Sequence, residues 1–131
     1  MLPKKEQTLM TLKAKKTGGR NSRIKGNRAE RLLLEQLTQQ GYGVRRTHLS
    51  LFPDIIAWNE QGFLFIEVKA RTNPKHITEA LYVFRNSVKE MTKLPKGANL
   101  LCYVRVNDTW RAFKSQNEDI IEVSPVVNEE R

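Results

Sequence analysis

Three acidic residues and one lysine, Glu30, Asp54, Glu67 and Lys69, have types and spacings suited to metal-assisted chemistry. In residues 27–40, leucines follow Glu30 at i+3, i+4 and i+7, so its carboxylate shares the apolar face of a predicted helix. Burying a lone carboxylate is costly unless a partner offsets its charge. The position of Glu30 therefore predicts a partner close to that carboxylate.

Asp54 and Glu67 are expected to face each other in a hairpin. The apolar runs DIIAW, which begins at Asp54, and FLFIEVK, which contains Glu67, flank the turn NEQG. Pairing Trp58 with Phe63 next to this turn sets the two carboxylates opposite each other. Directly paired like charges destabilise a sheet, so a counter-charge is expected here too. Two-residue periodicity places Lys69 on the same face as Glu67.

A hard divalent cation would offset both unfavourable placements. Mg²⁺ is usually held by one or two carboxylates together with waters and substrate phosphate. Such an ion polarises a phosphodiester and lowers the pKa of a bound water. Lys69 would orient that water or stabilise developing negative charge, and with a lowered pKa it would serve as a base. The residues predict phosphodiester hydrolysis with Mg²⁺, or Mn²⁺ in its place, bound by Glu30, Asp54 and Glu67.

The elements that must position these residues alternate between helices and strands. The predicted order is a helix over residues 27–40, strands over 42–47, 54–58 and 63–69, a helix after Asn73-Pro74, and a last hairpin formed by ANLLCYVRV and TWRAFK. Apolar residues on both faces of the two central strands predict helices on both sides of the sheet. The sequence thus predicts an α/β fold in the order αβββαββ.

Charge divides the chain unevenly. Residues 1–28 hold nine basic groups and one acidic group, a net charge of +8 out of +9 for the whole chain. We expect a basic flexible arm over residues 1–24, a globular domain over 25–114 and a polar C-terminal extension over 115–131. The basic segment, with Lys25 and Arg28 at its end, favours contacts with DNA phosphates. The alternative is a solvated leader that only aids solubility.

The composition excludes several classes of protein. No apolar run approaches the roughly 18–20 residues of a membrane span, and the N-terminus lacks the apolar stretch of a secretory signal. The single Cys102 excludes a disulfide framework and a cysteine–histidine metal cluster. We therefore expect a cytoplasmic protein with no membrane partner.

The same residues carry a family resemblance. Pro53-Asp54, twelve further residues and Glu67-Val68-Lys69 resemble the signature of the PD-(D/E)xK nuclease superfamily. The segments KGNRAER, GYGVRR and FIEVK look like those of the archaeal-type Holliday junction resolvases, and the likeness covers residues 25–113. It implies a restriction-endonuclease-like core with a central mixed β-sheet flanked by helices.

The resemblance also implies roles for individual residues. In such resolvases the helix glutamate, the motif aspartate and the E-x-K glutamate bind Mg²⁺ and the lysine assists hydrolysis, which implies these roles for Glu30, Asp54, Glu67 and Lys69. Arg31 and Arg46 match arginines that contact phosphate, and Ser50 matches a loop serine. The resemblance further implies a homodimer whose two sites nick opposed strands of a four-way DNA junction.

Two other functions stay open. Another PD-(D/E)xK nuclease, acting on flaps, forks or duplex DNA, would nick without preferring junctions. A non-catalytic DNA-binding protein would use the basic segment on a degenerate nuclease core. Taken singly, the residues also have ordinary structural interpretations, with Asp54 as a turn residue and with Glu67 and Lys69 as partners on a solvated face.

Overall fold

We describe the protein from a computed structural model, which covers residues 9–47, 52–91, 94 and 97–127, with side chains described except at 9–22 and 25. In chain order the elements are α1 (Leu9–Gln39), β1 (Gly43–Arg46), β2 (Ile55–Asn59), β3 (Gly62–Arg71), the short 3₁₀ helix η1 (Pro74–His76), α2 (Ile77–Lys89), β4 (Asn99–Val106), β5 (Thr109–Gln116) and β6 (Asp119–Val123). In these covered residues, no helix is both long enough and apolar enough to cross a membrane.

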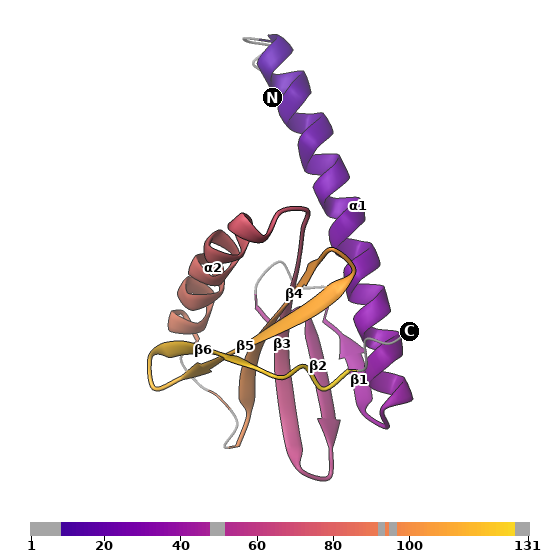
Figure 1. The fold of residues 1–131 in the computed structure, drawn as a ribbon, viewed down its shortest axis with the longest axis vertical. Helices are drawn as coiled ribbons and strands as arrows, with labels where there is room; N and C mark the ends of the chain where they lie inside the picture. The colour runs from indigo at the N-terminus through magenta and orange to yellow at the C-terminus, as the bar shows by residue number, and fades with distance from the viewer. Residues whose placement is uncertain (1–8, 48–51, 92–93, 95–96, 128–131) are drawn as a thin grey trace.

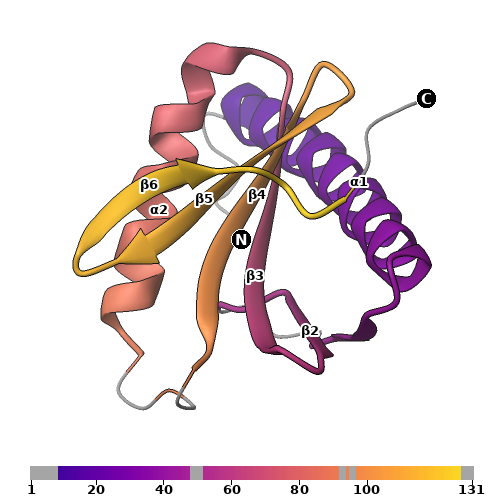
Figure 2. The ribbon, with the colours of Figure 1, turned by 60° about the horizontal axis from the view of Figure 1, so that its bottom comes forward.

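The six strands form one mixed sheet whose spatial order follows the chain, from β1 to β6. β3 and β4 run parallel because η1 and α2 carry the chain back between them, and every other neighbouring pair is antiparallel. The helices α1 and α2 lie on opposite sides of the sheet (Figures 1 and 2). The α/β prediction with a mixed sheet and flanking helices is confirmed.

Each helix buries its apolar stripe against one face of the sheet. Leu33 and Leu37 of α1 are fully buried in a cluster with Ile55 and Ile66. On the opposite face, Phe84 of α2 is fully buried in a second cluster that includes several β4 side chains. Both faces of the central strands are apolar because both are covered.

The predicted register of the motif hairpin is confirmed. Trp58 pairs with Phe63 and Ile55 pairs with Ile66, the register expected from the sequence; the ladder ends there, and the N–H of Asp54, the residue before β2, donates to the carbonyl of Ile66. The hairpin fixes this register through the length of its turn.

The first helix is longer than the sequence pattern indicates. α1 begins at Leu9 instead of residue 27, and it runs through the boundary expected at residue 24. The pair Gly18-Gly19 lies inside the helix although glycine costs about 1 kcal/mol per residue there. Since no proline occurs in α1, its backbone hydrogen bonds continue without a break. Figure 1 shows the first turns of α1 projecting beyond the sheet.

The segment expected to form a C-terminal extension adds a sixth strand. β6 pairs antiparallel with β5 across a turn at Asn117-Glu118, where φ is 51° and 71°. Asn107-Asp108 forms a turn of the same kind between β4 and β5, with φ of 53° and 63°. The turn at Asn107-Asp108 can be predicted from the sequence because Asn and Asp tolerate positive φ. The turn at Asn117-Glu118 is harder to predict because a glutamate seldom adopts positive φ.

Candidate active site

Asp54 is held at the entrance of β2 by hydrogen bonds on both sides of its backbone and through its side chain. Its N–H donates to the carbonyl of Ile66 at 2.9 Å, and its carbonyl accepts from Thr47 N–H at 3.0 Å. Its carboxylate atom Oδ2 accepts from the backbone N–H of Val68 at 2.8 Å. The sheet therefore fixes this carboxylate beside the part of β3 that carries Glu67 and Lys69.

Glu67 is the buried acid of the site. It is 6% exposed, and its Oε2 lies 2.9 Å from Lys69 Nζ. Its other oxygen, Oε1, is buried and accepts no hydrogen bond from any residue that the structure describes. A buried carboxylate oxygen without a partner pays its desolvation cost uncompensated, so this atom calls for a donor or a cation.

Asp54 lies within the electrostatic field of both other acids. Burial raises the pKa of its carboxyl group from the ordinary value of 3.8 to about 6, against the lowering effect of the Val68 N–H. The negative charges of Glu30 and Glu67 raise this pKa further, and the charge of Lys69 lowers it. The charges of both other acids therefore act on the carboxyl group of Asp54, while the joint role of the three acids stays a prediction.

Glu30 has a protein partner. Its Oε1 accepts from Arg46 Nε at 2.6 Å, and Arg46 Nη2 also donates to Asn27 Oδ1 at 2.8 Å. Arg46 pairs in the sheet with Ile55, which belongs to the core under α1. The side chains of Arg46 and Glu30 therefore meet on the α1 face of the sheet. The charge of Glu30, which is partly buried, is offset here by an arginine.

The other acids lie on the opposite side of the sheet. Glu67 pairs with Cys102 and Lys69 with Val104, both in the core under α2. Among the described residues no three Asp, Glu, His or Cys side chains gather closely enough to form a ready-made metal site. Asp54 directly precedes β2, and the charges of Glu30 on one side of the sheet and of Glu67 on the other both affect its pKa.

A divalent cation fits the oxygen donors of Asp54 and Glu67. Both are hard ligands of the kind that Mg²⁺ uses, and Glu67 Oε1 has no partner in the described structure. The repulsion that raises the pKa of Asp54 would be relieved by the same positive charge. Glu30 would have to leave or share Arg46 to join them.

The residues expected to contact DNA are spread over α1 and β1. Arg28 and Arg31 are exposed on α1, and Arg46 is half-buried in its pair with Glu30. Ser50 and the side chain of Lys25 lie outside the described part of the chain.

Sequence reasoning missed Asn27, the second acceptor for Arg46, although its position three residues before Glu30 on the same helix is a readable signal. It also missed Arg71, which follows Lys69 by two residues and so shares its face of β3.

Comparison with known proteins identifies one family. A family model described as archaeal Holliday junction resolvase (Hjc) matches residues 21–127, a stretch that contains the four motif residues. A solved structure of Hjc from Archaeoglobus fulgidus, a Holliday junction resolvase from an archaeal hyperthermophile, is 25% identical. That match covers 76% of this chain and 83% of the other, with a TM-score of 0.46. A search of curated proteins found no match.

Proposed function

The chain belongs to the archaeal Holliday junction resolvase family, and from that premise we propose that Asp54, Glu67 and Lys69 cut DNA junctions with Mg²⁺ as the metal. The protein is a structure-specific endonuclease of the junction-resolving type, and nucleases of this family depend on a divalent metal. The particular ion, the residues that carry the reaction and the assembly of the enzyme are the proposed part.

The observation that carries the proposal is the buried Oε1 of Glu67, which has no hydrogen-bond partner among the described residues, beside the carboxyl group of Asp54, whose pKa is raised. Together the two carboxyl groups provide oxygen ligands for a cation, and its positive charge would reduce the repulsion between them. Once bound, the metal supplies Lewis-acid polarisation of the phosphodiester and a water of lowered pKa.

Lys69 is proposed to stabilise the negative charge that develops on the phosphate during cleavage. Glu67 Oε2 holds its ammonium group at 2.9 Å, which keeps Nζ beside the ligand oxygens instead of in solvent. A fixed cation at that place costs no reorganisation when the charge develops. Glu30 is proposed as a further ligand, and Arg46, once released, as a donor to the substrate phosphate.

Resolution of a four-way junction needs two cuts, and each chain carries one such site. We therefore propose a homodimer that places two sites on opposed strands of the junction. The mass of the protein in solution, measured by light scattering with and without junction DNA, tests this. A stable monomer that still makes paired cuts would contradict the homodimer.

The deciding experiment is a cleavage assay on a labelled four-way junction, a matched duplex and a single strand, with Mg²⁺ and with a chelator. We expect symmetric paired nicks in the junction alone, and none with chelator. Glu60→Gln is a matched control, since Glu60 is exposed in the turn of the same hairpin. Equal cutting of linear duplex would replace this proposal with a general nuclease, and tight binding without cleavage in any metal would reject catalysis.

A further inference from the structure

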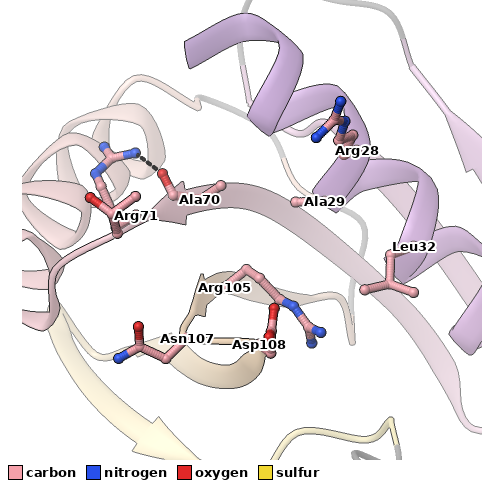
Figure 3. Close-up of a pocket in the computed structure, with 9 residues that line it drawn as sticks. Arg28, Ala29, Leu32, Ala70, Arg71, Arg105, Asn107 and Asp108 are labelled. Carbon is pink, nitrogen blue, oxygen red and sulfur yellow. Dashed lines mark hydrogen bonds between the residues drawn. The ribbon is translucent and has the colours of Figure 1, made fainter. Parts of the chain in front are cut away.

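We call Asp54 and Glu67, with Lys69 beside them, the acidic cluster. A second charged site lies at the C-terminal ends of β3 and β4, where they approach α1. It is an open pocket of about 460 Å³. Its lining includes Arg28, Arg71 and Arg105 and a single acid, Asp108 (Figure 3). We call this site the arginine pocket. Three guanidinium groups against one carboxylate give it a positive balance.

The three arginines reach the arginine pocket from three different elements. Figure 3 shows Arg28 on α1, Arg71 at the end of β3 and Arg105 on β4, around the same hollow. The guanidinium of Arg105 lies over the Trp110 ring, 5.2 Å from its centroid, which anchors it. Arg105 is therefore held in place, and we call the other two, Arg28 and Arg71, the rim arginines.

The rim arginines retain capacity for a ligand. Arg28 is exposed, and Arg71 donates through Nη1 to the carbonyl of Ala70 at 2.9 Å. The ion pair of Arg71 with Glu79 is long, 3.9 Å, and the Glu79 side chain is 70% exposed, so the pair is weak. A guanidinium offers five N–H donors in a planar fork that matches phosphate oxygens.

The arginine pocket is linked to the acidic cluster along β3. Arg71 follows Lys69 by two residues, so both side chains start from the same face of this strand. Two residues of a strand span about 7 Å. One nucleotide step advances about 3.4 Å along the helix axis of a DNA strand. Lys69 lies on the α2 side of the sheet and Arg105 on the α1 side, and Arg71 near the end of β3 lines the arginine pocket from the Lys69 side. A strand with a phosphate at Lys69 would thus bring a neighbouring phosphate to Arg71, at the edge of the arginine pocket.

From this geometry we infer that the arginine pocket is a phosphate subsite, which holds a backbone phosphodiester of the cut DNA strand one or two nucleotides from the scissile phosphate. The inference rests on the proposed function, because it takes the cleaved phosphate to lie at Lys69. It assigns phosphate contacts to Arg71 and Arg105 and places that of Arg28 in the same pocket.

The first test measures binding of a four-way junction in chelator over a series of salt concentrations. Arg28→Gln and Arg71→Gln should each weaken binding and lower the slope of log K against log [salt] by about 0.9, the value for one phosphate contact. Arg111→Gln is the matched control, because Arg111 is already paired bidentately with Glu122 outside the arginine pocket. Wild-type slopes in both variants would overturn the subsite.

Asp108→Asn tests the arginine pocket in the opposite direction. It removes the one acid of the described lining and keeps the turn, since Asn tolerates the positive φ of 63° at this position. Junction binding should tighten roughly twofold to fivefold, the range that exposed charge pairs contribute. Unchanged affinity would contradict a phosphate at this place.

Neutral methylphosphonate links, introduced one at a time near the cleavage point, locate the phosphate. A neutral link at one particular position should weaken binding of the DNA to the wild-type protein and leave binding to Arg71→Gln unchanged. The variant has already lost the guanidinium group that binds the phosphate at that position. An equal penalty in both proteins at every position would overturn the inference.

The two proposals fail separately. If the protein cuts junctions while Arg28→Gln and Arg71→Gln keep the wild-type salt slopes, only the phosphate subsite is contradicted. A protein that never cuts loses the proposed function, and its salt slopes still decide whether the arginine pocket binds phosphate. Thermal melting of each variant checks its fold, and two independent rim variants guard against one that misfolds.

Discussion

The acidic cluster and the arginine pocket share β3, yet they accommodate like charges in different ways. Glu67 is 6% exposed and leaves one oxygen without a partner in the described structure, and the pKa of neighbouring Asp54 rises to about 6. In the arginine pocket, Arg28 is exposed and Arg71 is partly exposed, so water still reaches these guanidinium groups. A buried carboxylate without a partner pays a desolvation cost that a cation would offset, whereas a hydrated arginine pays little such cost before an anion binds.

This contrast predicts that the acidic cluster responds to metal and pH and the arginine pocket responds to salt.

Removing one acid should abolish the reaction and leave DNA binding intact. Asp54→Asn or Glu67→Gln deletes a charged ligand, and cleavage of a four-way junction in Mg²⁺ should fall by roughly 10³-fold. Binding in chelator should stay within about twofold, because phosphate contacts come mainly from basic side chains. Undiminished cleavage by either variant would remove the proposed site.

Lys69→Met should lower the cleavage rate by roughly 10²-fold, since one fixed positive charge is removed from the reacting phosphate. Single-turnover rates at saturating protein separate this effect from binding. A variant that only raises the protein concentration needed for half-maximal rate would show that Lys69 binds DNA without assisting hydrolysis.

Metal should stabilise the fold through the same acids. A ligand that binds only the native state raises stability by about 1.4 kcal/mol at ten times its dissociation constant. We expect Mg²⁺ to raise the melting temperature of the wild type and of Arg28→Gln, and to have no effect on Asp54→Asn. Equal responses in all three proteins would indicate a metal site elsewhere.

The raised pKa of Asp54 predicts a pH effect on stability in chelator. Between its ordinary value of 3.8 and about 6, the folded state holds this proton more tightly than the unfolded chain. The unfolding free energy should therefore fall as pH rises through that interval, as Asp54 ionises in a buried place. Urea unfolding at several pH values should show a shallower fall for Asp54→Asn. Identical profiles for the two proteins would argue against the raised pKa.

The smallest effect on turnover is expected from the basic N-terminal segment. Deleting residues 1–20 removes six basic groups that precede the family match. Junction binding should weaken, and its salt slope should drop by about 0.9 for each phosphate that this segment neutralises, while the rate at saturating protein stays the same. An unchanged slope would show that this segment does not touch DNA.

Much of the fold and of the motif geometry follows from local sequence. Alternation along β3 places Glu67 and Lys69 together, and the turn after Trp58 sets the register of β2 against β3 up to Ile55, the residue next to Asp54. These relations span a few residues and depend on backbone periodicity, so they can be predicted from the sequence. The catalytic roles of these residues remain predictions, which the experiments above test.

Other features depend on contacts between distant segments. The pair of Glu30 with Arg46 forms only because β1 lies under α1, and the sequence does not show which cation will neutralise a buried acid. The start of α1 at Leu9 was missed because its glycine pair looks like a linker.

By itself, the sequence determined the order of the elements through β5 and the hairpin that carries the motif, because both rest on short-range periodicity, and its motifs resemble those of the family that the family model matches. Only the tertiary structure decided that Arg28, Arg71 and Arg105 line one pocket, and that Arg46 holds Glu30 on the opposite face from Lys69. The physical reason is that strand order and helix packing bring together side chains many residues apart, and no local pattern encodes their meeting.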